Sequence, residues 1–336
     1  MGARQRIKRL TPYLLLAPGI LWLLVFYVYP SIQMFISSFW TGTLETGFTF
    51  SLANWTTYTE ALDRYSPQFL RSLLYGAAAT VICFVIAYPL AYAIAFRGGQ
   101  YKNVLLFLVI APFFTSFLLR TISWKIILAY SGLVLGPLKQ IGILPEEFRL
   151  LATPAAVIAG ITYNFLPFMT LPLYVALEKI DKRLIEAAED LYAGPWRPQG
   201  TVAGLAIGGV LGLVVGLVMD YGPFALSIPF GLAGAAIGTW LISQAFIRVT
   251  LPLALPGIFA GSLLTFIPAV GDFVNAELLG NPQSLMIGNV IQARYLQVTD
   301  YPTASALSFI LMLAILIGLF IYARIIGTEE LTGASI

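Results

Sequence analysis

Long runs of apolar side chains recur along this chain, and they constrain its fold more than any other feature of the sequence. Each run holds about 20 residues, which is enough for a helix to cross the roughly 30 Å hydrocarbon core of a bilayer. Only 10% of the residues are charged, against about 25% in a soluble domain, so an ordinary soluble fold is excluded. The sequence therefore predicts an all-α fold, a polytopic transmembrane helical bundle, with spans near residues 12–38, 70–96, 103–119, 154–177, 201–219, 224–242, 250–270 and 303–323.

The basic residues give these spans a direction. Twelve of the nineteen Lys and Arg residues fall on one side of the membrane if the N-terminus is cytoplasmic, as the positive-inside rule requires. We therefore expect both termini in the cytoplasm. The basic start and apolar run at the N-terminus have the form of a signal peptide, but no small-residue cleavage site follows, so we expect a retained first span.

Missing residue types exclude several kinds of chemistry. The chain has no histidine and one cysteine, Cys83, within an apolar run. A disulfide framework, a Cys/His zinc site and a His-assisted nucleophile are therefore unavailable. Since no GxxxxGK[ST] loop occurs either, we expect a protein that is not an enzyme, has no metal site and needs no cofactor of its own. If ATP is used, a separate subunit binds it.

One charged segment interrupts the apolar pattern, "LEKIDKRLIEAAEDLYAGPWR", residues 177–197. Its apolar residues recur at helical spacing, namely Ile180, Leu184, Ala187, Ala188 and Leu191. This pattern predicts a short amphipathic helix on the cytoplasmic face, which Ala193-Gly194-Pro195 would end. From the pattern alone, a helix inserted in a groove of a partner protein and a helix lying among lipid headgroups are both open.

Joining Arg197 directly to Ala245 produces a known pattern, "LIEAAEDLYAGPWR–AFIRVTLPLALPGIFAGSLLTF". It resembles the EAA loop of ABC-importer permeases, with glycine usual in the family where Tyr192 stands here. The matching positions are Glu186, Ala187, Ala188, Ala193, Phe246, Val249, Leu251, Pro252, Pro256, Gly257 and Ile258. Outside 198–244, stretches such as "APFFTSFLLRTISWKIIL", "LPFMTLPLYVALEKID" and "GDFVNAELLG" are most similar to permeases of spermidine/putrescine importers, the PotB type.

The resemblance implies a subunit of an ATP-driven importer in the bacterial inner membrane. Its partners would be a second permease subunit, a cytoplasmic ABC ATPase dimer and an extracytoplasmic substrate-binding protein. The EAA loop would be the coupling helix seated in an ATPase cleft, with Glu186 as the main polar contact. The other residues of this ATPase-coupling set would be Ala187, Ala188, Asp190, Lys182, Arg183, Ala193 and Gly194.

A polycationic substrate needs acidic and aromatic groups near its pathway, because a buried cation requires paired charge or ring faces. Asp272 and Glu277, just after span 250–270, are the acidic candidates, and either could instead mark the end of a span. Trp124 and Tyr163 are aromatic candidates, with Tyr130 and Tyr174 as further ones. Each ring could equally belong to an interfacial aromatic belt or to core packing.

Residues 198–244 are foreign in composition, because they hold ten of the thirty glycines. Five of these recur every fourth residue from Gly200 to Gly216, a spacing that lets helices approach closely in lipid. We predict an inserted glycine-rich transmembrane hairpin of two helices within a six-span permease domain formed by residues 1–197 and 245–336. The hairpin splits the EAA loop, so it could be a lesion, a tolerated insertion or an added partner-binding module.

The leading functional hypothesis is therefore a permease subunit for polyamines. A permease for another small solute is the alternative within the same class, and Asp272 and Glu277 weigh against an anion. A channel or secondary transporter would need internal repeats or intramembrane charge pairs, which the sequence does not show. A non-transporting scaffold with the hairpin as its assembly module stays open, and it predicts membrane partners without ATP-linked flux.

Overall fold

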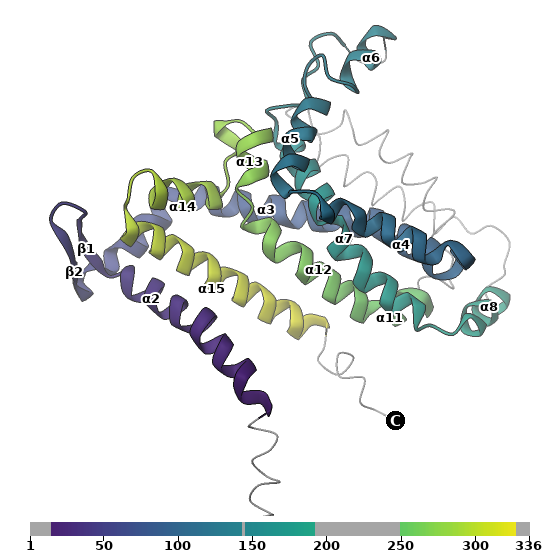
Figure 1. The fold of residues 1–336 in the computed structure, drawn as a ribbon, viewed down its shortest axis with the longest axis horizontal. Coiled ribbons are helices and arrows are strands. Elements are labelled where there is room, and N and C mark those ends of the chain that lie inside the picture. Colours follow the sequence, from purple (N-terminus) through teal and green to yellow (C-terminus); the bar gives the residue numbers. More distant parts are fainter. Residues whose placement is uncertain (1–14, 143–144, 192–248, 327–336) are drawn as a thin grey trace, which may run out of the picture. The chain divides into compact units, whose positions relative to one another are not determined.

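The computed structural model describes residues 15–142, 145–191 and 249–326, which are mainly helical (Figure 1). The chain divides into two compact units, one formed by residues 1–67 and 290–320, the other by residues 68–289 and 321–336.

The helices confirm the predicted all-α membrane fold. Four of the described helices are long and apolar enough to cross a bilayer, namely Leu15–Ser37, Leu52–Arg97, Pro154–Glu178 and Tyr301–Arg324. The pair Gly99–Phe114 and Phe117–Ile127 bends by 94° at its break and adds a fifth crossing if it counts as one span. Leu255–Val270 is apolar but shorter. The predicted spans 201–219 and 224–242 lie outside the described residues.

The first unit contains a short β-hairpin that the sequence did not predict. Strand β1 (Trp40–Thr43) pairs antiparallel with β2 (Gly47–Phe50), so that Trp40 lies opposite Phe50. Helix α3 begins at Thr56, well before the predicted span 70–96. Ala61 and Tyr65, four residues apart, are both buried, and such spacing favours a continued helix over a loop.

The elements from the N-terminal side to the middle of the chain follow in this order: η1 (Leu24–Val28), α2 (Tyr29–Ser37), the hairpin, η2 (Leu52–Trp55), α3 (Thr56–Tyr92), η3 (Ala93–Arg97), η4 (Gly99–Tyr101), α4 (Lys102–Ile110), η5 (Ala111–Phe114), α5 (Phe117–Ile127) and α6 (Leu135–Gln140). The later elements are α7 (Pro154–Glu178), α8 (Lys182–Leu191), α11 (Leu251–Leu253), α12 (Leu255–Val270), α13 (Val274–Leu279), η7 (Pro282–Ser284), α14 (Ile287–Leu296) and α15 (Tyr301–Ile326).

Helix α7 is the centre of the second unit, and α12 packs closely against it. Two glycines one turn apart on α12 make this approach possible. A Cβ on Gly257 would lie 2.7 Å from the carbonyl oxygen of Pro172, and one on Gly261 would lie 2.8 Å from the sulfur of Met169. Small residues at this spacing are a common way for helix backbones to meet in a membrane. The α7–α12 pair therefore forms a rigid support for the segments at its ends.

Candidate functional site

Helix α8 is the charged helix that the sequence predicted, and it follows α7 after only three residues. Asp181 begins it: its Oδ1 accepts a hydrogen bond from the backbone N–H of Arg183 at 3.0 Å, and its carbonyl accepts one from Leu184. A side-chain oxygen that accepts from the first turn satisfies an otherwise unpaired donor and fixes where a helix starts. The short, capped connection ties the orientation of α8 to that of α7.

One side of α8 is buried in its own unit. Ile185 joins Ile180 in a hydrophobic cluster with Leu177 and Leu173 of α7, and Ala188 is also buried. The predicted apolar stripe was wrong in part, because Leu184 is 52% exposed and Ala187 is exposed too. Ile185 is buried instead, because the turn after α7 places the side of α8 that carries Ile185 against α7.

The other side of α8 is open and carries most of the predicted coupling residues: Lys182, Arg183, Glu186, Ala187 and Asp190 are all exposed. Together with Leu184 they form a surface of mixed charge around one apolar side chain. Ala193, Gly194 and the segment 198–244 lie outside the described residues. On the far side of that segment, Leu251–Leu253 form the short helix α11 and α12 begins at Leu255.

An ion pair that the sequence did not predict joins the end of α7 to the start of α4. Lys102 Nζ lies 2.5 Å from Glu178 Oε1 and 5.2 Å from the ring centre of Tyr174. Glu178 is the last residue of α7, four residues before α8 begins. The Lys102 contact therefore fixes the end of α7, from which α8 continues after three residues.

A second polar feature is buried near the other end of α7. Asp272 is 6% exposed. Its Oδ1 accepts from the Asn275 N–H at 2.8 Å and its Oδ2 accepts from Asn275 Nδ2 at 2.6 Å. Burial raises the pKa of the Asp272 carboxyl, and the hydrogen bonds from Asn275 and from the Val274 N–H oppose this rise. Asp272 therefore fixes the first turn of α13.

Asn275 also forms hydrogen bonds with residues of α5 and α7. Asn275 Oδ1 accepts from Thr121 Oγ1 of α5 at 3.3 Å and from Asn164 Nδ2 of α7 at 3.2 Å. Asn164 Nδ2 also donates to Thr121 Oγ1 at 3.2 Å. We call Asp272, Asn275, Thr121 and Asn164 the buried polar network. Asn164 Oδ1 has no partner among the described residues, so the network is only partly satisfied. The hydrogen bonds it does contain join α5, α7 and α13 and favour one arrangement of these three helices.

The predicted pathway residues gather around α13 in part. Trp124 and Tyr163 form an edge-on pair with ring centres 5.4 Å apart. Trp124 also packs against a cluster that contains Leu279 of α13. Glu277 is exposed on α13, whereas Asp272 is buried before it.

The two further aromatic candidates already face cations of this chain. Lys139 Nζ lies 3.3 Å from the ring centre of Tyr130, and Tyr174 contacts Lys102. Sequence reasoning missed Thr121, Asn164 and Asn275. Asn164 did carry a signal, since it is an amide inside an apolar span, where polar residues are costly and have a purpose.

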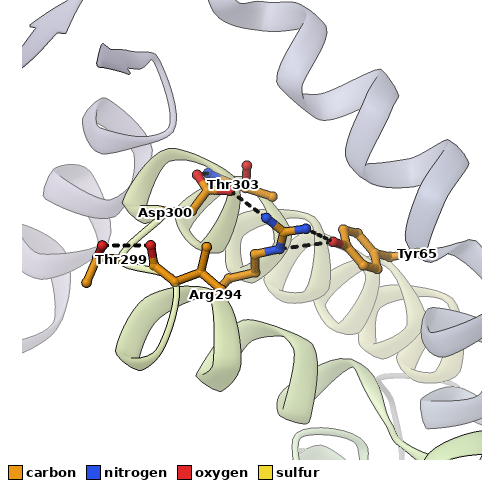
Figure 2. A network of polar contacts seen from close by, with 6 residues as sticks. Tyr65, Arg294, Thr299, Asp300 and Thr303 are labelled. Atoms are coloured by element: carbon orange, nitrogen blue, oxygen red, sulfur yellow. Dashed lines mark hydrogen bonds and ion pairs between the residues drawn. The ribbon is translucent and has the colours of Figure 1, made fainter. Parts of the chain in front are cut away.

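The first unit has a polar cluster of its own (Figure 2). Arg294 of α14 donates to Tyr65 Oη through Nε at 3.0 Å and Nη2 at 2.5 Å, and it pairs with Asp300 through Nη1 at 3.1 Å. Asp300 Oδ1 in turn accepts from the Thr303 N–H in the first turn of α15. Thr299 reaches a φ of 56° in this turn, so the cluster holds a tight connection between α14 and α15.

Comparisons with known proteins agree with this architecture. Residues 242–327 match the family model described as binding-protein-dependent transport system inner membrane component. The spermidine/putrescine transport system permease protein PotB of Haemophilus influenzae is 34% identical over 305 residues, covering 90% of this chain and 90% of the relative. PotB of Escherichia coli is 33% identical over 304 residues, covering 90% and 93%.

More distant relatives show the same kind of protein. The inner membrane ABC transporter permease protein YdcU of Escherichia coli is 27% identical over 327 residues, covering 92% of this chain and 87% of the relative. Among solved structures, a bacterial ABC transporter involved in the import of alginate has a TM-score of 0.59 at 18% identity, covering 96% of this chain and 97% of the matched one. At that identity the likeness concerns the fold.

Proposed function

We infer the function of this chain from the family to which it belongs, the spermidine/putrescine transport system permeases of the PotB type. The chain is a multi-pass inner-membrane permease subunit of an ABC importer, and its substrate is a polyamine such as spermidine or putrescine. It forms part of the substrate pathway and has no catalytic site, because ATP is bound and hydrolysed by a separate subunit. Both termini lie in the cytoplasm.

The observation that carries this proposal is the attachment of α8. Its exposed side presents Glu186, Leu184 and Asp190, while Ile185 anchors the opposite side in the core. An amphipathic helix with one charged, open face suits a groove on a partner protein. We assign α8 as the ATPase-docking element, with Lys182 and Arg183 at its rim. Ala193 and Gly194 belong to the same loop in this proposal.

The substrate pathway in this proposal runs past α13. Glu277 is its exposed carboxylate and contacts a substrate ammonium, whereas the buried Asp272 positions the helix that carries Glu277. Trp124 and Tyr163 line the same region through their ring faces, which attract cations. A second permease subunit supplies the other half of the pathway, and an extracytoplasmic binding protein delivers the substrate.

Residues 198–244 are, in this proposal, an inserted hairpin of two membrane helices that splits the EAA loop. The permease domain then consists of residues 1–197 and 245–336. The insert contains an even number of spans, so the chain leaves and returns on the same side of the membrane. The topology of the later spans is therefore the same with or without the insert.

Uptake of radiolabelled spermidine tests the function directly. The chain is expressed with its partner permease, ATPase and binding protein in a bacterium that lacks polyamine importers, beside a version without residues 198–244. We expect ATP-dependent spermidine uptake by at least the shortened chain, and its loss on Glu186→Lys. An assembled complex that moves no polyamine with either version contradicts the proposal.

A further inference from the structure

Four phenylalanines gather at the break between η5 and α5, from both sides of the bend and from α7. Phe113 lies edge-on to Phe168 with ring centres 5.1 Å apart. Phe165 lies 6.2 Å from Phe117 and 6.0 Å from Phe168. We call Phe113, Phe117, Phe165 and Phe168 the phenylalanine cluster. It joins the two halves of a bent span to the central helix of the second unit.

A cation of the same chain already faces this cluster. The guanidinium carbon of Arg120 lies 5.3 Å from the ring centre of Phe113 and 5.7 Å from that of Phe117. Arg120 is only 8% exposed. Within the described part of the chain, neither its Nε nor its Nη1 has a hydrogen-bond partner. The guanidinium of this buried residue thus lies over ring faces.

Such a placement is unfavourable for a residue that serves structure alone. Buried donors without acceptors cost free energy, and an arginine within a membrane protein usually pairs or marks a functional site. A neighbouring subunit cannot supply the missing acceptors from outside, since Nε and Nη1 are both shielded from the surface. What the side chain does find is the negative face of aromatic rings, which attracts a desolvated cation.

The bend adds a second attraction for positive charge. The first half of the span, α4 and η5, ends at Phe114 before the 94° break. A helix that stops within a membrane presents its C-terminal carbonyl groups there, and these carry partial negative charge. The phenylalanine cluster lies beside this helix end, at the opposite end of the span from Lys102.

We propose that the phenylalanine cluster is a binding site for an alkylammonium group, held in this structure by the Arg120 guanidinium, which leaves when an ammonium of the substrate enters. The proposal rests on the polyamine function proposed above and names one subsite of the pathway. The exchange replaces one cation by another, so the buried charge stays constant. Arg120 Nε and Nη1 make no hydrogen bonds with the described residues, so the departure of the guanidinium breaks none at these two atoms.

The test is equilibrium binding of radiolabelled spermidine to the purified complex of both permeases and the ATPase, without the binding protein. Arg120→Gln removes the competing cation, so we expect binding about tenfold tighter. This lies between the scales of an exposed and a desolvated cation–π contact, because Arg120 is 8% exposed and Phe113 is 38% exposed. Arg120→Lys keeps a cation and should bind as the parent does. Adding Phe113→Leu to Arg120→Gln should abolish the gain.

Phe114→Leu is the matched control, because Phe114 is adjacent to Phe113 but 79% exposed. Combined with Arg120→Gln, it should leave the gain intact. Unchanged spermidine affinity in Arg120→Gln, or loss of the partner permease from that variant, would overturn the subsite. Spermidine uptake by the parent complex and by the version without residues 198–244 is measured alongside. Uptake with no effect of Arg120→Gln on binding refutes only the subsite, whereas no uptake and no binding by either version refutes the polyamine function.

Discussion

The two ends of α7 use polar side chains in opposite ways. At its C-terminal end, α8 displays exposed charges, and the Lys102–Glu178 pair has side chains 26% and 44% exposed. In the buried polar network, Asp272, Asn275, Thr121 and Asn164 are between 0% and 6% exposed and bond to one another. The exposed charges at α8 can exchange water for groups of a partner protein. The buried polar network fixes α5, α7 and α13 relative to one another.

The difference in exposure sets the energies involved. An exposed ion pair contributes about 0–1 kcal/mol to stability because water competes for both charges. A hydrogen bond to a buried charged group contributes about 1.5–3 kcal/mol, and its loss costs more when the partner stays buried. The buried polar network should therefore determine whether the unit folds. The exposed side of α8 should determine whether the permease couples to the ATPase.

The largest expected effect comes from breaking the buried polar network. Asn275→Ala removes a donor to Asp272 and the shared acceptor of Thr121 and Asn164. We expect a loss of about 3 kcal/mol in the free energy of unfolding, seen as a lower thermal midpoint of the purified complex. Glu277→Gln, on the exposed side of the same helix, should change stability by less than about 0.5 kcal/mol. Equal melting of both variants would contradict the network's role.

A neighbouring pair on α8 separates packing from docking. Ile185→Ala removes a buried side chain and should cost about 2 kcal/mol, at the low end for such a truncation. Leu184→Ala, one residue earlier and 52% exposed, should leave the melting temperature unchanged but reduce the amount of ATPase that co-purifies. If Leu184→Ala retains the ATPase fully, the exposed side of α8 is not the docking surface.

The smallest effect on stability, below about 1 kcal/mol, is expected for the Lys102–Glu178 pair. Its effect on coupling should be larger, because the pair holds the end of α7, from which α8 continues after three residues, against α4. Lys102→Glu should keep ATP hydrolysis but move less spermidine per ATP, and the exchanged pair Lys102→Glu with Glu178→Lys should restore the ratio.

Lys179→Glu is the control for that exchange, since Lys179 is exposed, adjacent to Glu178 and outside the two ion pairs of the described residues. It should leave the ratio of spermidine to ATP unchanged. A double exchange that transports no better than either single variant would show that the pair does not position α8.

Much of the fold could be predicted because bilayer crossing imposes long apolar runs. The predicted span 154–177 corresponds to the helix Pro154–Glu178, and the charged segment does form α8. The length of α3 was missed because its first turns are amphipathic rather than apolar. The break at residues 115–116 was missed because the apolar run continues across it, and the predicted span 103–119 ended one residue before Arg120.

The candidate sites were predictable only where they are local. The helical spacing over residues 180–191 predicted α8 because those residues are consecutive, and the coupling role of this helix stays a prediction. The buried polar network joins Thr121 to a residue 154 positions away, and no local periodicity reveals such a partner. The Trp124–Tyr163 pair shows the same limit, because both rings were candidates while their contact was not predicted.

The docking of α8 is tested most directly by proximity. Glu186→Cys is labelled with a photoactivatable maleimide before the ATPase is added; the native Cys83 is 0% exposed in this chain and stays unlabelled. Glu277→Cys, on α13, is the control. The account predicts that light cross-links position 186, and not position 277, to the ATPase. An ATPase that cross-links to neither position, or equally to both, would contradict it.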